Sequence, residues 1–243
     1  MGDIYCFCIN VPGSLPPRPK PNRKRLNIWA AIKNIMSKKG KAWQNRDKEY
    51  NITPLELLDI YHRLEKLFDD VAILGGRAVN IYIFGDKRFT KDIDVAVKLP
   101  DVPLKMLKDA ILENGFIYET YDDGKLKKLI NRETNTSIDL YYSADLGGIH
   151  IEDLLSLAKT RTLGHDSETV KVVNPALLIL MKLKSNRPKD IEDVGKLIQN
   201  LYGTPEKFIE KENAVLSRYL DLSDFGFLRS RLETARYEQL LRS

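Results

Sequence analysis

The amino-acid sequence predicts an α+β protein, in which a mixed β-sheet is flanked by helices and followed by a C-terminal helical region. Hydrophobic residues make up 43% of the 243 residues, which is enough to bury one sizeable core. Apolar residues recur at helical spacing in several segments, and short apolar runs bounded by turn residues lie between them. Some of the expected strands are joined by helices and others by tight turns, a combination typical of a mixed sheet.

The folded part is expected to begin near Thr53. Thr53, Pro54 and Glu56 form the pattern of an N-cap, a first-turn proline and a capping-box glutamate, which predicts a helix extending to Asp69. The elements expected after it are a strand at 71–74, a helix at 77–84, a strand at 93–97, a helix at 104–114 and strands at 116–120, 126–131 and 137–142.

From Ile151 onwards the sequence predicts mainly helices. Asn174 is the expected N-cap of one helix, Asp190 the cap of the next, and Pro205 the start of a third, with a last helix at 227–242. The chain is therefore expected to divide into a partly disordered arm at 1–50, an α/β domain at 53–173 and a helical region at 174–243.

Positive charge is concentrated in the arm. Residues 1–50 hold eleven basic and three acidic residues, although the whole chain has a net charge of only +5. Five prolines within 12–25 oppose helix and strand formation there. The arm is either a solvated extension or a segment that contacts nucleic acid.

Cysteine content and hydropathy indicate a cytoplasmic location. Cys6 and Cys8 are too close to form an unstrained disulfide, so a reduced intracellular chain is expected. The longest apolar run, 176–181, is far shorter than the ~20 residues that span a bilayer, and no membrane association is expected.

A glycine pair, Gly75-Gly76, lies between an expected strand and an expected helix. Glycines at this position let the backbone approach a ligand, and the helix N-terminus offers N–H groups to phosphate. A tight turn that simply requires glycine would give the same pattern.

Three aspartates on two expected strands could bind a metal ion. Asp92 and Asp94 alternate with Ile93, so both carboxylates project from one face, where Mg²⁺ or Mn²⁺ could bind between them. Asp139 interrupts another apolar strand and joins them if the two strands are neighbours. The alternatives are two exposed aspartates at a strand edge and, for Asp139, an ion pair with a Lys or Arg.

Together, these motifs resemble the polymerase-beta-like nucleotidyltransferase superfamily, and more narrowly its AbiEii-type and related minimal members. Gly75-Gly76-Arg77-Ala78 and the segment RFTKDID at 88–94 are similar to their Gly-Gly-x-Ala and Arg-x-Thr-x-Asp-Ile-Asp signatures. The segment LMKLKSNRPKDIEDV at 180–194 is similar to the helix-turn-helix that follows their catalytic domain. The resemblance covers about residues 55–200.

The resemblance implies a metal-dependent transfer of an NMP group from a nucleoside triphosphate, ATP among the candidates, to an acceptor hydroxyl of RNA, protein or a small molecule. Asp92, Asp94 and Asp139 would be the catalytic and metal-binding residues. The residues that would hold the triphosphate are Gly75, Gly76, Arg88, Lys182 and Lys189. The resemblance also implies a toxin role with an antitoxin protein as partner.

Two departures from the pattern keep a second interpretation open. Position 76 is glycine where many active members have serine, and fifteen residues separate Gly76 from Asp92, more than in the general superfamily. The alternative is therefore a non-catalytic binding or regulatory module with the same fold, whose basic arm contacts nucleic acid.

Overall fold

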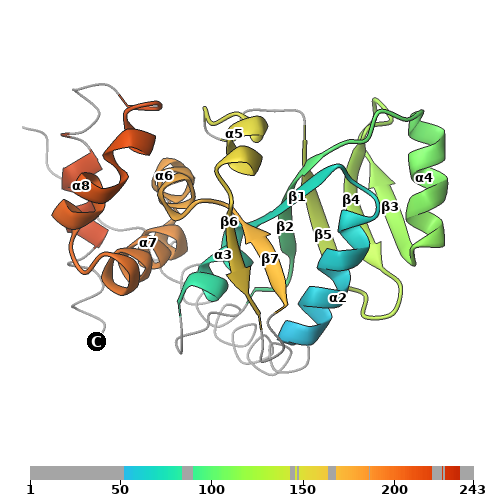
Figure 1. Ribbon diagram of the computed structural model, residues 1–243, viewed down its shortest axis with the longest axis horizontal. Helices are drawn as coiled ribbons and strands as arrows, with labels where there is room; N and C mark the ends of the chain where they lie inside the picture. The colour runs from blue at the N-terminus through green and yellow to red at the C-terminus, as the bar shows by residue number, and fades with distance from the viewer. Residues whose placement is uncertain are drawn as a thin grey trace, which may run out of the picture. The chain divides into compact units, whose positions relative to one another are not determined.

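A mixed β-sheet forms the centre of the computed structural model. The structure describes residues 52–83, 90–142, 146, 148–163, 168–185, 187–220, 226 and 228–235, which belong to one unit, Tyr50–Ser243. Within them the sheet has seven strands in the order β3-β4-β5-β2-β1-β7-β6 (Figure 1). The strands are β1 Asp70–Leu74, β2 Ile93–Lys98, β3 Phe116–Thr120, β4 Leu126–Asn131, β5 Ser137–Tyr141, β6 Lys159–Thr162 and β7 Thr169–Val172.

The sheet is mixed because β2 pairs with β5, and β1 with β7, in parallel. The other neighbouring pairs, β1 with β2, β3 with β4, β4 with β5 and β6 with β7, are antiparallel. This confirms the predicted α+β class with a mixed sheet and flanking helices.

The helices largely follow the predicted pattern. They are α2 Pro54–Glu65, α3 Gly75–Tyr82, α4 Leu104–Glu113, α5 Ile151–Ser156, α6 Pro175–Ser185, α7 Pro188–Leu201 and α8 Pro205–Leu216. The capping box at Thr53 is present, but α2 ends with Lys66 as its C-cap, short of Asp69. The predicted arm at 1–50 lies outside the described residues.

The hairpin of β6 and β7 was not expected, since the sequence predicted mainly helix after Ile151. All four residues of β6 are exposed and polar, so this strand has no apolar alternation to reveal it. Only Val170 and Val172 of β7 are buried, which is too short a pattern to identify. β7 nevertheless joins the sheet beside β1, with Ile73 opposite Val172.

The two expected N-caps of the C-terminal region have different outcomes. Asn174 accepts a hydrogen bond from the Ala176 N–H at 2.8 Å and is confirmed as the residue that starts α6. Asp190 is not a cap, because Arg187 is the N-cap of α7 and Asp190 lies in its first turn. The side chain of Asp190 is instead used in a buried ion-pair network.

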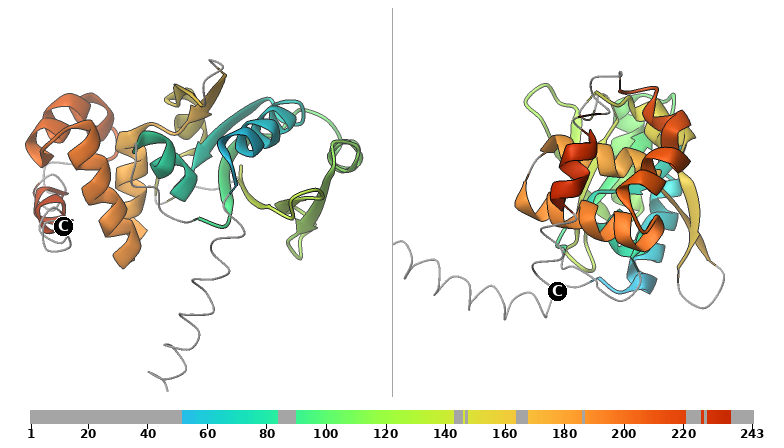
Figure 2. Two further views of the ribbon diagram at one scale, coloured as in Figure 1. Left: turned by 90° about the horizontal axis from the view of Figure 1, so that it is seen from below. Right: turned by 90° about the vertical axis from the view of Figure 1, so that its left-hand side faces the viewer.

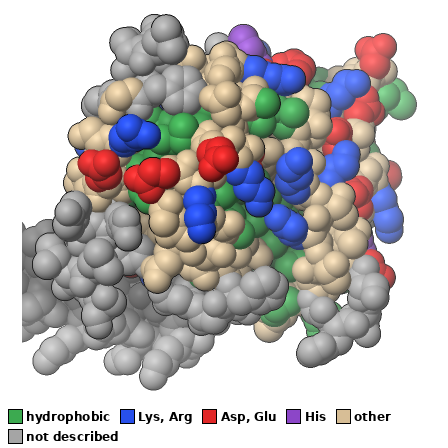
Figure 3. Space-filling view, turned by 60° about the vertical axis from the view of Figure 1, so that its left-hand side comes forward, with side chains coloured by type: hydrophobic (Ala, Val, Ile, Leu, Met, Phe, Trp, Pro, Cys, Tyr) green, Lys and Arg blue, Asp and Glu red, His purple; other side chains and the backbone are tan. Residues whose placement is uncertain are grey.

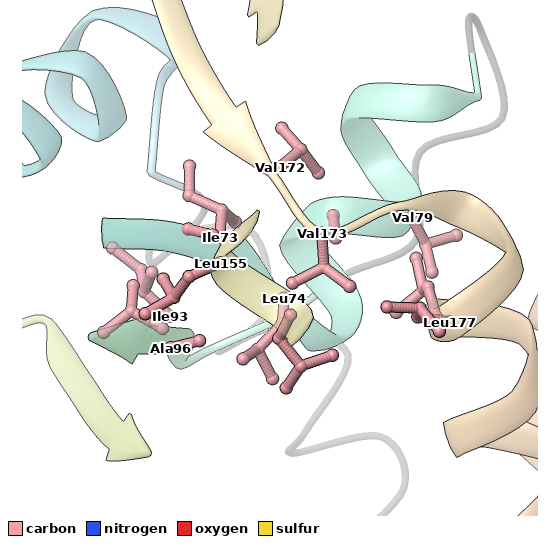
Figure 4. Packing of buried hydrophobic residues seen from close by; sticks show 14 of the residues in the cluster. Ile73, Leu74, Val79, Ile93, Ala96, Leu155, Val172, Val173 and Leu177 are labelled. Atoms are coloured by element: carbon pink, nitrogen blue, oxygen red, sulfur yellow. The ribbon is translucent and has the colours of Figure 1, made fainter. Parts of the chain in front are cut away.

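The central strands are buried on both faces. Val71–Leu74 of β1 and Val95–Val97 of β2 are buried without alternation, as expected for strands covered on two sides. Figure 4 shows part of this core, in which Leu155 lies close to Ile93 and Ala96. α6, α7 and α8 pack on one another, and α6 and α7 both contact α3 (Figure 2). No helix in the described part of the chain is long and apolar enough to span a membrane.

The capping box at Thr53 gives a direct test of the N-terminal boundary. Thr53→Ala removes the oxygen that accepts from the Glu56 N–H, and we expect it to lower the free energy of unfolding by about 1 kcal/mol. Urea denaturation measures this change. Thr53→Ser keeps the hydroxyl and should stay close to the wild type; an equal loss in both variants would contradict the capping role.

Candidate functional site

The candidate site is centred on two aspartates that lie side by side on β2 and β5. These strands are parallel and in register, so that Asp94 is directly opposite Asp139. Paired residues of adjacent strands project to the same face. Asp92 lies in the bend just before β2, and its charge is close enough to raise the pKa of Asp94. The structure thus brings the three predicted aspartates near one another.

The Asp94 carboxylate is partly buried and lies close to two other carboxylates. Burial raises the pKa of Asp94, and the negative charges of Asp139 and Asp92 raise it further. The Tyr141 hydroxyl donates a hydrogen bond to Asp94 Oδ1 at 3.4 Å, which counteracts part of this effect. A cation bound beside Asp94 would relieve the repulsion.

Gly75 lies against this carboxylate at the start of α3. Its φ is +64°, and a Cβ added there would lie 1.9 Å from Asp94 Oδ2. Leu74, the N-cap residue, is opposite Asp94 in the β1–β2 pair and has no polar side chain to cap the helix. The glycine is therefore needed both for the backbone turn and for the close approach to Asp94, and the helix begins at Gly75 rather than after the glycine pair.

A buried arginine positions the segment that leads into β2. Arg77 Nη2 donates to the Thr90 carbonyl at 2.7 Å, and Thr90 Oγ1 donates to the Asp92 carbonyl at 3.2 Å. Thr90 thereby supports the turn before Asp92. Arg77 was not expected, because its partner is distant in the sequence; burial lowers its pKa, while the charge of Asp92 acts in the opposite direction.

Asp139 has a basic partner on the adjacent strand. Lys128 Nζ lies 3.3 Å from Asp139 Oδ1, and the two residues are directly opposite in the antiparallel pairing of β4 with β5. This is the ion pair that the sequence left open as an alternative for Asp139. The identity of the lysine could not be predicted, because it depends on the register between the two strands.

Lys182 is the buried centre of an ion-pair network between α6 and α7. Its Nζ lies 2.9 Å from Asp190 Oδ1 and 2.7 Å from Asp193 Oδ2, and its side chain is only 6% exposed. Burial opposes ionisation of Asp190, but hydrogen bonds from Ser185, Lys182 and Arg187 lower the pKa of this carboxyl to about 2. The positive charge of Lys182 also lowers the pKa of Asp94, so it acts on the candidate site from α6.

The structure gives less information on Lys189 and Arg88, the other two residues predicted to bind phosphate. Lys189 is exposed in the first turn of α7, and Arg88 lies outside the described residues. Lys and Arg side chains gather in the middle of the face shown in Figure 3, with acidic side chains on either side of them.

The donor chemistry of the site suits a hard divalent cation. Carboxylates are the ligands that Mg²⁺ and Mn²⁺ prefer, usually together with water and substrate phosphate oxygens. Among the described residues, no three acidic, histidine or cysteine side chains are grouped closely enough to hold a metal without moving. Asp92, Asp94 and Asp139 could hold a cation together only after their side chains rearrange.

A comparison with protein families identifies the class of the protein as a nucleotidyltransferase. A family model described as "Nucleotidyl transferase of unknown function (DUF2204)" matches residues 55–224. The chain belongs to this family and is thereby an enzyme of the nucleotidyltransferase class. No curated protein sequence matches the chain.

Three solved structures are similar in fold at low sequence identity. The antibiotic-resistance factor ANT(2'')-Ia, solved in solution, has 16% identity and a TM-score of 0.45 over 72% of this chain and 99% of its own. A nucleotidyltransferase-like antigen of Paracoccidioides brasiliensis has 18% identity and a TM-score of 0.43, covering 74% and 91%. The Megavirus polyadenylate synthase has 14% identity and a TM-score of 0.39, covering 80% and 40%.

The contact between Gly75 and Asp94 predicts an unusually large effect of a small substitution. Gly75→Ala adds the cost of a positive φ, about 1 kcal/mol, to a clash with Asp94 Oδ2, so we expect a clearly larger loss of stability. Gly124→Ala is the matched control, since Gly124 has φ +80° and nothing within 4 Å of an added Cβ. Equal losses in urea denaturation would contradict the crowding at Asp94.

The buried network predicts that lysines differ sharply in their contribution to stability. Lys182→Met leaves Asp190 and Asp193 buried without their shared cation, and should cost about 3–5 kcal/mol. Lys171→Met breaks the more exposed pair with Asp70 and should cost at most about 1 kcal/mol. Thermal and chemical denaturation measure both; a similar, small loss would show that the Lys182 pairs do not stabilise the fold.

Proposed function

We propose that the protein is a metal-dependent nucleotidyltransferase, which moves an NMP group from a nucleoside triphosphate to an acceptor hydroxyl. The observation that carries the proposal is the pairing of β2 with β5, which sets Asp94 opposite Asp139 and beside Gly75 at the start of α3. The charge of Asp92, just before β2, also acts on Asp94. The family assignment supports the reaction class, and the aspartates supply the ligands that the reaction requires.

Asp92 and Asp94 would hold Mg²⁺ or Mn²⁺, and Asp139 would contribute to a second cation position. Bound cations would neutralise the triphosphate and stabilise the entering and departing oxygens. Asp139 would also accept the proton of the acceptor hydroxyl. The hydroxyl oxygen then bonds to the α-phosphorus, the bond from the α-phosphorus to the bridging oxygen breaks, and pyrophosphate leaves with that electron pair.

The triphosphate would lie across the first turn of α3. Gly75 and Gly76 let its phosphates approach the backbone N–H groups, whose positive helix end favours an anion. Arg88, Lys182 and Lys189 would supply positive charge. Lys182 would act on the triphosphate only through its long-range charge, since its ammonium group donates hydrogen bonds to Asp190 and Asp193.

The acceptor and the biological role depend on the motif resemblance. The AbiEii-type signatures at 75–78 and 88–94 support a toxin that modifies RNA, a protein or a small molecule and is neutralised by an antitoxin protein. The alternative, a non-catalytic module that binds nucleotide without transferring it, rests on Gly76 in place of serine, and the family assignment favours the enzyme. The same experiment separates these two functions.

A transfer assay tests catalysis directly. The protein is incubated with each α-labelled nucleoside triphosphate, Mg²⁺ or Mn²⁺, and total cellular RNA or protein. We expect label transfer that falls at least about a hundredfold in Asp92→Asn and Asp94→Asn, because several kcal/mol of charge stabilisation is lost.

Asp101→Asn is the matched control, since this aspartate is exposed beyond the end of β2 and should keep full activity. Equal label in the wild type and in Asp92→Asn would refute catalysis. Thermal stabilisation by triphosphate and Mg²⁺ without any transfer would support the non-catalytic module.

A further inference from the structure

The two neighbouring carboxylates of the site differ in how their charge is balanced. Asp139 forms a salt bridge with Lys128, at 3.3 Å between Oδ1 and Nζ. Among the described residues, Asp94 has a hydroxyl donor, Tyr141, and no salt bridge is found for it. The Asp94 carboxylate can therefore accept an added cation directly, whereas the Asp139 carboxylate is already paired with the Lys128 ammonium group.

We propose that Lys128 is the counter-ion of Asp139 in the metal-free site, and that it competes with a divalent cation for this carboxylate. The inference rests on the proposed metal-dependent function and names the residue that controls the second cation position. Lys128 would act as a positioning residue, which holds Asp139 until a cation replaces it.

The geometry of β4 and β5 supports this role. Lys128 and Asp139 are directly opposite in an antiparallel pair, so both side chains project to the face that carries Asp94. Their side chains are 26% and 31% exposed, and water can therefore receive the ammonium group when it leaves. Lys128 also interacts electrostatically, though more weakly, with Asp92, so its charge reaches a second carboxylate of the site.

Competition follows from elementary electrostatics. A divalent cation bound to Asp139 would lie within a few ångströms of the ammonium group, and the two positive charges would repel each other. The cation must therefore displace Lys128 before it can use this oxygen. A cation that binds Asp92 and Asp94 does not have to displace Lys128. We therefore expect the position at Asp94 to fill first and the position at Asp139 to fill second.

A double-mutant cycle tests the pair without reference to catalysis. Lys128→Met, Asp139→Asn and the double variant are unfolded in urea, first with EDTA and then with saturating Mn²⁺. In EDTA we expect the pair to contribute a coupling of about 1.4- to 5-fold in the unfolding equilibrium constant, typical of a partly exposed ion pair. In saturating Mn²⁺ the coupling should disappear, because the cation has replaced the lysine.

Direct Mn²⁺ titration, followed by the electron paramagnetic resonance signal of the free ion, gives the second measurement. Lys128→Met should bind the weaker Mn²⁺ about 1.4- to 5-fold more tightly than the wild type, since the ion no longer has to break the pair of Lys128 with Asp139. Lys105→Met is the matched control: it removes the same charge from an exposed position on α4, which packs against the edge strand β3. Its Mn²⁺ affinity should equal that of the wild type.

The outcomes separate this inference from the proposed function. Mn²⁺ binding with equal affinity in the wild type and in Lys128→Met, or a coupling that persists in saturating Mn²⁺, overturns the competition and leaves the metal-dependent reaction intact. Absence of Mn²⁺ binding in every variant overturns both the competition and the proposed metal site.

Discussion

The parallel register between β2 and β5 is the constraint on which the site depends. It places Asp94 directly opposite Asp139, and a slip by one residue would turn Asp139 to the other face of the sheet. The apolar residues between them fix this register, because Ile93 and Val95 on β2, like Ile138 and Leu140 on β5, are fully or almost fully buried. The packing that stabilises the core therefore also sets the spacing of the carboxylates.

The same place in the fold carries several locally unfavourable features. Gly75 has a positive φ, a Cβ at its position would overlap the Asp94 carboxylate, and burial and like charges raise the pKa of Asp94. The first two features exclude other residue types from position 75, the third costs free energy, and none improves the packing of the core. Costs of this kind are expected where a site is built for a ligand rather than for stability.

Local signals in the sequence predicted the elements but not their pairing. The capping box at Thr53, the cap at Asn174 and the alternation around Asp139 all act within a few residues, and the structure has these features. Asp92 was expected on the strand with Asp94, but it lies in the bend before β2. The hairpin of β6 and β7 lacked such a signal. The contacts of Lys128 with Asp139 and of Arg77 with Thr90 depend on strands and loops that meet only in the folded chain, so no pattern in the sequence could identify them.

A comparison of the two acidic clusters shows why a ligand belongs at one of them. Between α6 and α7, two carboxylates, Asp190 and Asp193, are balanced by Lys182 and Arg187, and the network is complete within the protein. On the face of β2 and β5, three carboxylates face a single paired lysine, Lys128, among the described residues. Both clusters lie near α3, yet only the second retains excess negative charge. Divalent cations would balance that excess, and this is the physical reason why we propose metal binding at the second cluster and structural stability for the first.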